Sequence, residues 1–379
     1  MLAKWLGLDR KAAGRTIALS FAPGAAWSAR GYAGFAREGY AQNPVAHRCV
    51  RLIAEAAAAC PLIVQGEGRA ADTARALLKR PNPDQSAPEL METVYGHLSV
   101  AGDAYVEIAG SEGGPFALYA LRPDRVSVLP GPKGWADGWE YRHGSEKRVF
   151  ARDRASGKSP ILHLKLFNPV ADHYGLSPME AAARAVDVHN SGGAWAKALL
   201  DNAARPSGAL VVGGRDGEGR LSESQYARLK DELEALYTGP QNAGRPLLLE
   251  GGLDWKPMGH SPAEMDFIEA RREAAREIAL AFGVPPMLLG LPGDNTYSNY
   301  REANLAFYRQ TVLPLAKKTA AALEAFLSPW LGAALGVIAD EEALPALQEE
   351  RAMRWRRIVE ADFLSDDEKR ALLGLKEQA

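Results

Sequence analysis

The chain has 379 residues, of which 47% are hydrophobic and 24% are charged. This composition is typical of a globular protein with two or three packed domains, and no apolar run is long enough to predict a membrane-spanning helix. The formal net charge of −2 argues against a high-affinity DNA clamp, because proteins that grip phosphates carry an excess of lysine and arginine.

Residues 1–42 are rich in glycine, alanine and arginine but show no sustained period, so the sequence predicts a flexible arm. This stretch also lacks the apolar region of a signal peptide. The first clear helix begins at Asn43 and Pro44, because asparagine is a good N-cap and proline is tolerated at the first helical position. Pro61 ends this helix, and residues 62–64 are predicted to form a strand.

An α+β domain is predicted over residues 43–170. A capping box of Ser86 and Glu89 starts a second helix, which runs to about Val100 and ends at Gly102. Short strands separated by glycine- and proline-containing turns follow. These strands are Ala104–Ala109, Phe116–Leu121, Val126–Leu129, Trp139–Arg142, Lys147–Phe150 and Ile161–Phe167.

The organisation changes after the last of these strands. A capping-box sequence at Ser177 predicts one helix to about Ala203, roughly 39 Å long at 1.5 Å per residue. Its apolar positions are mostly alanine and glycine, so it needs close neighbours. A small β-α-β-β insert is predicted over residues 205–260, and a second long helix is predicted from Ser261 to Gly283. Two long helices that bracket an insert suggest an antiparallel pair with the insert at its tip.

The last third of the chain is predicted to be mostly helical. A polar loop over residues 284–298 leads into a long helix over residues 299–326. Pro314 lies inside this helix and predicts a kink, because it removes one backbone hydrogen bond. Two further helices are predicted, one over Glu349–Glu360 and one with a capping box at Ser365.

No motif predicts catalysis. The glycine-rich stretch Gly213–Gly219 lacks the Gly-Lys-Ser/Thr end of a phosphate-binding loop, and the zinc-protease and serine-hydrolase motifs are absent from the sequence. His163 and His173 only flank a loop, which is a poor metal pattern. Cys49 and Cys60 are too few for a disulfide framework and are predicted to be buried, reduced thiols. The sequence therefore predicts no catalytic residue, no metal and no cofactor.

Nine segments between residues 43 and 330 form an ordered pattern. They are Asn43–Leu62, Leu77–Ser86, Gly102–Ile108, Leu121–Leu129, Gly175–Val186, Asn202–Leu210, Asn242–Met258, Glu277–Gly290 and Asn295–Asn299. Each segment alone is weak, but in this order they resemble the HK97-type portal proteins of tailed phages and gene transfer agents. The end of the chain matches that family poorly.

The resemblance implies an α+β portal fold with an α/β wing, long stem helices, a small β-α-β-β clip, a kinked tunnel helix and a reduced helical crown. It divides the chain as follows: N-terminal arm 1–42, wing 43–176, first stem helix 177–204, clip 205–260, second stem helix 261–283, tunnel loop 284–298, tunnel helix 299–328, and crown or C-terminal region 329–379.

The resemblance also implies a role without enzymatic activity. The protein would form a ring, expected to be a dodecamer, at one vertex of a virion or phage-like particle assembled in the bacterial cytoplasm. Double-stranded DNA would pass through the ring during packaging and ejection, with non-specific contacts. Implied protein partners are the large terminase, then the head–tail adaptor, and the major capsid protein; no membrane is implied.

Two groups of residues are the predicted sites. The DNA-channel candidates in the tunnel loop are Asp294, Asn295, Thr296, Tyr297, Asn299 and Arg301. The partner-binding candidates in the clip are Arg215, Arg220, Tyr226, Lys230, Tyr237, Arg245 and Trp255. The alternative for the first site is an ordinary capped loop before a helix. For the whole chain, the alternatives are another head–tail connector ring component or an enzyme with an unrecognised site.

Overall fold

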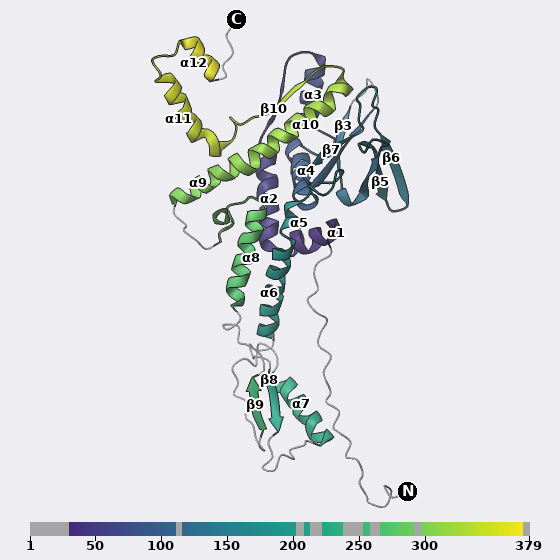
Figure 1. Cartoon of the computed structure of the whole chain (residues 1–379), viewed down its shortest axis with the longest axis vertical. Helices are drawn as coiled ribbons and strands as arrows, with labels where there is room; N and C mark the ends of the chain where they lie inside the picture. Colours follow the sequence, from purple (N-terminus) through teal and green to yellow (C-terminus); the bar gives the residue numbers. More distant parts are fainter. Residues whose placement is uncertain are drawn as a thin grey trace, which may run out of the picture.

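The computed structural model describes residues 30–110, 116–201, 208–212, 222–237, 253–257, 266–291 and 297–373. It has a body of helices and sheets from which a pair of long helices projects, and a small strand-and-helix unit lies at the far end of that pair (Figure 1). The mixed helix-and-sheet architecture is as predicted. No helix within these described ranges is long and apolar enough to cross a membrane.

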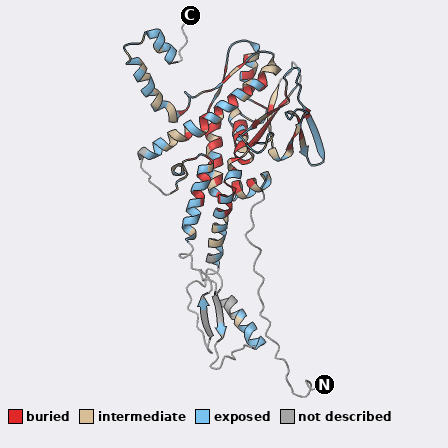
Figure 2. Cartoon of the chain, viewed as in Figure 1, coloured by how far each residue is buried: buried red, intermediate tan, exposed pale blue. Residues whose placement is uncertain are grey.

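Helices α2 and α4 form the centre of the body, where the buried residues concentrate (Figure 2). These helices span Pro44–Ala58 and Ala87–Ala101. The helix α2 buries Cys49 and Ile53, and α4 buries Leu90 and Val94, so each presents one apolar face to the other. The predicted capping box of α4 is present, because the Ser86 amide donates to the Glu89 carboxylate over 2.6 Å.

The N-cap of α2 is more deeply embedded than the sequence indicates. Asn43 is fully buried, and its side-chain oxygen accepts hydrogen bonds from the amides of Val45 and Ala46 at 3.1 and 3.0 Å. Its amide nitrogen contacts His189 Nδ1 at 3.2 Å and donates to Asn190 Oδ1 at 2.9 Å. One side chain therefore caps α2 and joins it to helix α6, which spans Ala183–Asp201.

Replacing Asn43 with alanine should lower the free energy of unfolding by about 2–4 kcal/mol, because it removes a helix cap and leaves buried polar partners unsatisfied. Ser86→Ala is the matched control, since it removes only an exposed cap and should cost about 1 kcal/mol. Urea unfolding of both variants measures the difference. If both variants lost the same free energy of unfolding, the contacts of Asn43 with α6 would not contribute to stability.

Two antiparallel three-stranded sheets complete the body. In the first, the central strand β2 pairs with β3 and β7; in the second, the central strand β5 pairs with β4 and β6. The strands are β2 Asp103–Ala109, β3 Ala117–Leu121, β4 Val126–Pro130, β5 Ala136–His143, β6 Glu146–Ala151 and β7 Ile161–Lys165. All six were predicted. A small core that includes Tyr105, Trp139 and Phe150 joins the two sheets.

A third sheet joins distant parts of the chain. Strand β1, Leu62–Gln65, pairs antiparallel with β10, Gly336–Ala339, and Val64 lies opposite Val337. The strand β1 was predicted, but its partner was not. Helix α3, Arg69–Lys79, follows β1 and also was not predicted.

The projecting pair consists of α6 and α8, which lie side by side (Figure 1). Helix α8 spans Phe267–Ala281, and Trp195 of α6 stacks on Phe267 with ring centroids 4.3 Å apart. The small unit at their far end contains strands β8 and β9 and helix α7 (Figure 1). Their bounds are β8 Gly208–Val212, α7 Glu223–Tyr237 and β9 Leu253–Pro257, and β8 pairs antiparallel with β9.

One detail of this pair differs from the prediction. The helix predicted from Ser177 is divided into α5, Pro178–Ala181, and α6, with Ala182 between them. The second long helix, α8, begins at Phe267 in the described part of the chain, and Asp266 before it has φ 50° and lies outside the helix; the predicted start near Ser261 lies outside the described residues. Residues 258–265 are outside the described part of the chain.

A long helix crosses the body in two parts that continue one another (Figure 1). The first, α9, spans Tyr297–Phe307, and the second, α10, spans Leu313–Leu331. Between them residues 308–312 form a π-helical turn, directly before Pro314. The irregularity lies where Pro314 predicted one, because proline cannot donate the helical hydrogen bond. The helix extends beyond the predicted end and includes Pro329.

The C-terminal helices stand apart from the body (Figure 1). They are α11, Gln348–Val359, and α12, Asp366–Leu372, and both were predicted. The capping box of Ser365 and Glu368 is present. Neither helix contains a buried residue, so packing within this chain stabilises them weakly.

The predicted N-terminal arm is wrong for its last part. Residues 1–29 lie outside the described chain, but α1, Tyr32–Gly34, and a π-helical segment, Phe35–Ala41, pack on the body. Phe35 is buried in the main core, and Gly39 lies so close to Met179 that a β-carbon would meet its sulfur at 2.4 Å. These contacts come from helices distant in sequence, so the local composition did not reveal them.

Candidate functional site

The predicted tunnel loop begins in a packed turn. After α8, Gly283 adopts φ 64°, and its carbonyl accepts a hydrogen bond from Thr311 Oγ1 at 2.7 Å. The Val284 amide donates to the Ala279 carbonyl at 2.9 Å, and the Val284 side chain is buried. A short 3-10 helix, Pro286–Leu289, follows. The first half of the predicted loop is therefore fixed against the π-helical turn between α9 and α10.

The predicted DNA-channel residues are only partly described. Asp294, Asn295 and Thr296 lie outside the described residues. Tyr297 is the first residue of α9, and its side chain is not described. Asn299 and Arg301 are exposed on the first turns of α9, the helix that follows the loop, but positions two apart on a helix point in different directions.

The position of Arg301 adds a feature that the sequence did not indicate. Its guanidinium lies 3.3 Å from the Glu349 carboxylate at the start of α11. Arg309 pairs with Glu350, and Lys317 of α10 pairs with Glu341. All six side chains are largely exposed, so each pair contributes about 1 kcal/mol or less. These ion pairs join α11 and the segment before it to α9 and α10, and Leu344 of that segment also packs in a small apolar cluster with Leu313 and Ala316.

The predicted clip residues belong to the small unit at the tip. Tyr226 is 64% exposed on α7, and Lys230 is exposed on the same helix. Tyr237 ends α7 and Trp255 lies opposite Leu210 in the β8–β9 pair, although the side chains of these three residues are not described. The remaining predicted residues, Arg215, Arg220 and Arg245, lie outside the described residues.

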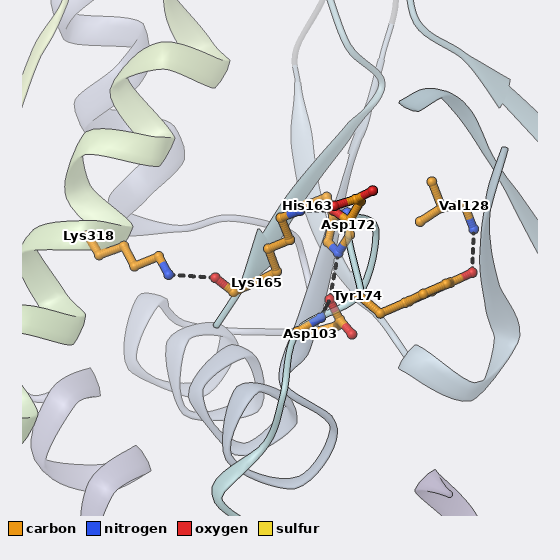
Figure 3. Close-up of polar contacts among 8 residues, drawn as sticks. Asp103, Val128, His163, Lys165, Asp172, Tyr174 and Lys318 are labelled. Atoms are coloured by element: carbon orange, nitrogen blue, oxygen red, sulfur yellow. Dashed lines mark hydrogen bonds and ion pairs between the residues drawn. The ribbon is translucent and has the colours of Figure 1, made fainter. Parts of the chain in front are cut away.

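A polar junction fixes strand β7 against its neighbours (Figure 3). Asp103 Oδ1 lies 2.8 Å from His163 Nε2 and accepts a hydrogen bond from the Gly175 amide at 2.9 Å. The Val128 amide donates to the Tyr174 hydroxyl at 3.0 Å. Asp103 therefore fixes the orientation of the His163 ring.

Lysines border the same junction (Figure 3). The Lys318 ammonium donates to the Lys165 carbonyl, which connects α10 to the end of β7. Burial, and then the positive charge of Lys165, lower the pKa of Lys318. Lys165 in turn donates to the Asp172 carbonyl.

The thiols have no environment that would make them reactive. Burial raises the pKa of Cys49 to about 12 and that of Cys60 to about 11, so both are protonated at neutral pH. Both are free and buried, as predicted. No group of three or more His, Cys, Asp or Glu side chains that could hold a metal ion occurs in the described part of the chain.

The sequence of this chain is similar to those of known proteins. The family model described as phage portal protein matches residues 44–374. An uncharacterised protein of Rickettsia bellii is 40% identical over 89% of this chain and 88% of its own length. The portal protein of Enterobacteria phage HK97 is 28% identical over 80% of this chain and 72% of its own length.

Solved structures agree with the sequence comparisons. A chain from the neck of a native gene transfer agent particle, computed with C12 symmetry, is 53% identical to this chain. The similarity covers 92% of this chain and 95% of the other, with a TM-score of 0.71. An HK97-family phage portal protein from Corynebacterium diphtheriae shares the fold, with a TM-score of 0.58 at 16% identity over 84% of this chain and 98% of the other.

Proposed function

The chain belongs to the phage portal protein family, and from this membership we propose that it forms a ring at one capsid vertex and conducts double-stranded DNA. One observation carries the proposal: the 53% identity, over nearly the whole chain, to a protein from a particle neck with C12 symmetry. That symmetry supports a ring of twelve copies. The family consists of structural proteins, so we assign no catalytic role.

The architecture supports an assignment of parts. We assign residues 43–176 to the wing, and α5, α6 and α8 to the stem within residues 177–204 and 261–283. The clip would be residues 205–260, the tunnel loop 284–298 and the tunnel helix 299–328. Residues 329–379 would form a reduced crown. In support, α6 and α8 carry the small unit at their tip, and α9 and α10 form one long interrupted helix.

The stem supports the ring proposal through its exposed apolar residues. Ile268 and Leu280 on α8 are 68% and 80% exposed, and Val188 on α6 is 40% exposed. In a single copy these side chains face water, whereas a neighbouring copy would bury them. Gly192 and Gly193 of α6 lie next to Arg271 of α8, so these small residues allow the two helices of the pair to approach each other.

Electron microscopy and native mass spectrometry of the purified protein test the ring. We expect closed rings with a central channel, and a mass corresponding to about twelve copies, because the exposed stem residues stabilise only an assembled state. Monomers and dimers under every condition of protein concentration and salt would contradict the proposal.

The tunnel loop is proposed to touch the DNA that passes through the ring. Substituting Asn295 and Asn299 with lysine should slow packaging at low salt, because each added phosphate contact adds about 0.9 to the salt slope and is repeated around the ring. Packaging should partly recover as ionic strength rises, since screening weakens the added attraction. The measurement is packaging rate against ionic strength.

Alanine at the same two positions is the matched control and should do less harm, since it removes only weak polar contacts. Wild-type packaging by the lysine variant at low salt would remove the loop from the DNA path. Failure of the lysine variant to form rings would show that the loop is a packing element, which is the alternative stated above for this segment.

A further inference from the structure

A cleft of about 790 Å³ lies between the second sheet, strand β7 and helix α10. Val128, His163, Lys165 and Asp172 line it, and they surround the polar junction described above (Figure 3). None of the described residues of the tunnel loop or the clip contributes to this lining. The cleft has the volume of a ligand pocket and no role in the proposed DNA path.

The lining is positively charged. Lys133, Arg152 and His173 contribute basic side chains, and in the described part of the chain none of the three pairs with a carboxylate. Among the described residues, the Lys165 ammonium donates to the Asp172 backbone carbonyl and forms no ion pair with a carboxylate. Asp172 is the one acidic side chain among the lining residues. An occupant that brings carboxylates would therefore be attracted.

The cleft also has apolar walls. Trp139, together with Ala322 and Phe326 of α10, supplies its inner surface, and Trp135 at its edge is 72% exposed. The loop between Lys165 and Asp172 exposes two further apolar side chains, Phe167 at 83% and Val170 at 86%. Aromatic side chains exposed next to unpaired cations are typical of surfaces that bind another protein.

One buried donor lacks an acceptor at this place. Trp139 is 3% exposed, and its indole N–H has no hydrogen-bond partner in the described structure. A buried donor without an acceptor costs about 1–3 kcal/mol. This nitrogen is itself shielded from solvent, so a ligand in the cleft would be recognised by the cationic side chains and the apolar walls and not by this donor.

We propose that this cleft binds an extended peptide segment in which an acidic residue stands beside a large apolar one, supplied by another protein of the particle. That the peptide comes from another protein of the particle rests on the proposed portal function. The cleft and the chemistry of its ligand do not depend on that function. The chain's own N-terminal segment, residues 1–29, does not match, because basic residues exceed acidic ones in it. Duplex DNA fits less well, because its evenly spaced phosphates require a cationic stripe and not one concave pocket with apolar walls.

The test uses the full-length protein and a bead-bound library of random dodecapeptides. We expect the selected peptides to contain Asp or Glu next to Phe, Trp, Leu or Ile. One selected peptide, synthesised with a fluorescent label, should bind at least tenfold more weakly to the double variant Lys133→Glu, Arg152→Glu. The control variant Arg69→Glu, Lys79→Glu makes the same change of charge on exposed residues of α3 outside the cleft and should bind as the wild type does.

Selected peptides without acidic residues, or peptides that bind both double variants equally, would overturn the proposal. A labelled 30-base-pair duplex is assayed in parallel. If the cleft variant loses affinity for this duplex while no acidic peptide is selected, the cleft is a DNA surface and the proposal is wrong. Electron microscopy of the same proteins tests ring formation separately from peptide binding. If the wild type forms no rings, the proposed function is contradicted, but the result for peptide binding is unaffected.

Discussion

Replacing Gly102 with alanine should destabilise the body by roughly 3–5 kcal/mol. Gly102 caps the end of α4 with φ 78°, and an added β-carbon would lie 2.6 Å from the carbonyl carbon and oxygen of Gly175. Backbone atoms cannot rotate away as a side chain can. The same residue accepts a hydrogen bond from the Leu166 amide at 2.8 Å, so a shift would disturb the end of β7 as well.

The control for this variant is Gly144→Ala. Gly144 also has a positive φ, 61°, but an added β-carbon would meet no atom within 4 Å. This variant should lower the free energy of unfolding by only about 1 kcal/mol, because alanine tolerates a positive φ less well than glycine does. Urea unfolding followed by circular dichroism measures both losses. If Gly102→Ala were no worse than Gly144→Ala, the close contact between Gly102 and Gly175 would not exist in solution.

Deleting residues 207–258 should abolish DNA packaging while the rest of the protein still folds. The main hydrophobic core, as far as the structure describes it, contains no residue of this segment. The helices that carry it end close together, because Trp195 stacks on Phe267. A short turn can therefore join them. The deleted part is the proposed clip, which would dock the terminase motor, so we expect loss of docking and of packaging together.

This deletion has three measurements. Thermal unfolding should retain the transition of the body, a pull-down should lose the terminase, and particles should contain no DNA. The matched control is Asp231→Ala, which alters one exposed residue of α7 outside the predicted partner-binding set and should leave folding, docking and packaging unchanged. Particles of the deletion variant that fill with DNA would remove this unit from the packaging mechanism. Loss of the body's transition would instead show that the unit stabilises the fold.

The elements that the sequence predicted correctly are those with local signals. Capping boxes at Ser86 and Ser365 and the asparagine N-cap at Asn43 set the starts of three helices. Alternating strands bounded by glycine and proline turns predicted both three-stranded sheets. These signals depend on hydrogen bonds between residues two to four apart, so no tertiary information is needed to recognise them.

The features that the sequence did not predict depend on distant contacts. Strand β10 is only four residues long, and its partner β1 lies near the other end of the chain. The π-helical segment Phe35–Ala41 is ordered by α4, α6 and Met179, and not by its own glycine-rich composition. The cleft beside β7 combines residues from four elements, and no motif of the sequence joins them. The ordered family pattern, in contrast, predicted the family correctly.

The pairing of β1 with β10 also determines when a chain can finish folding. During synthesis Leu62–Gln65 leaves the ribosome early, whereas Gly336–Ala339 appears only after the other described strands of the body have been made. Until then β1 has an unpaired edge, and Val64 lacks the cover of Val337. A nascent chain that is released too soon, or cut before Ala339, keeps an open body. In the proposed ring, a copy that ends before Ala339 would therefore join its neighbours with an open body.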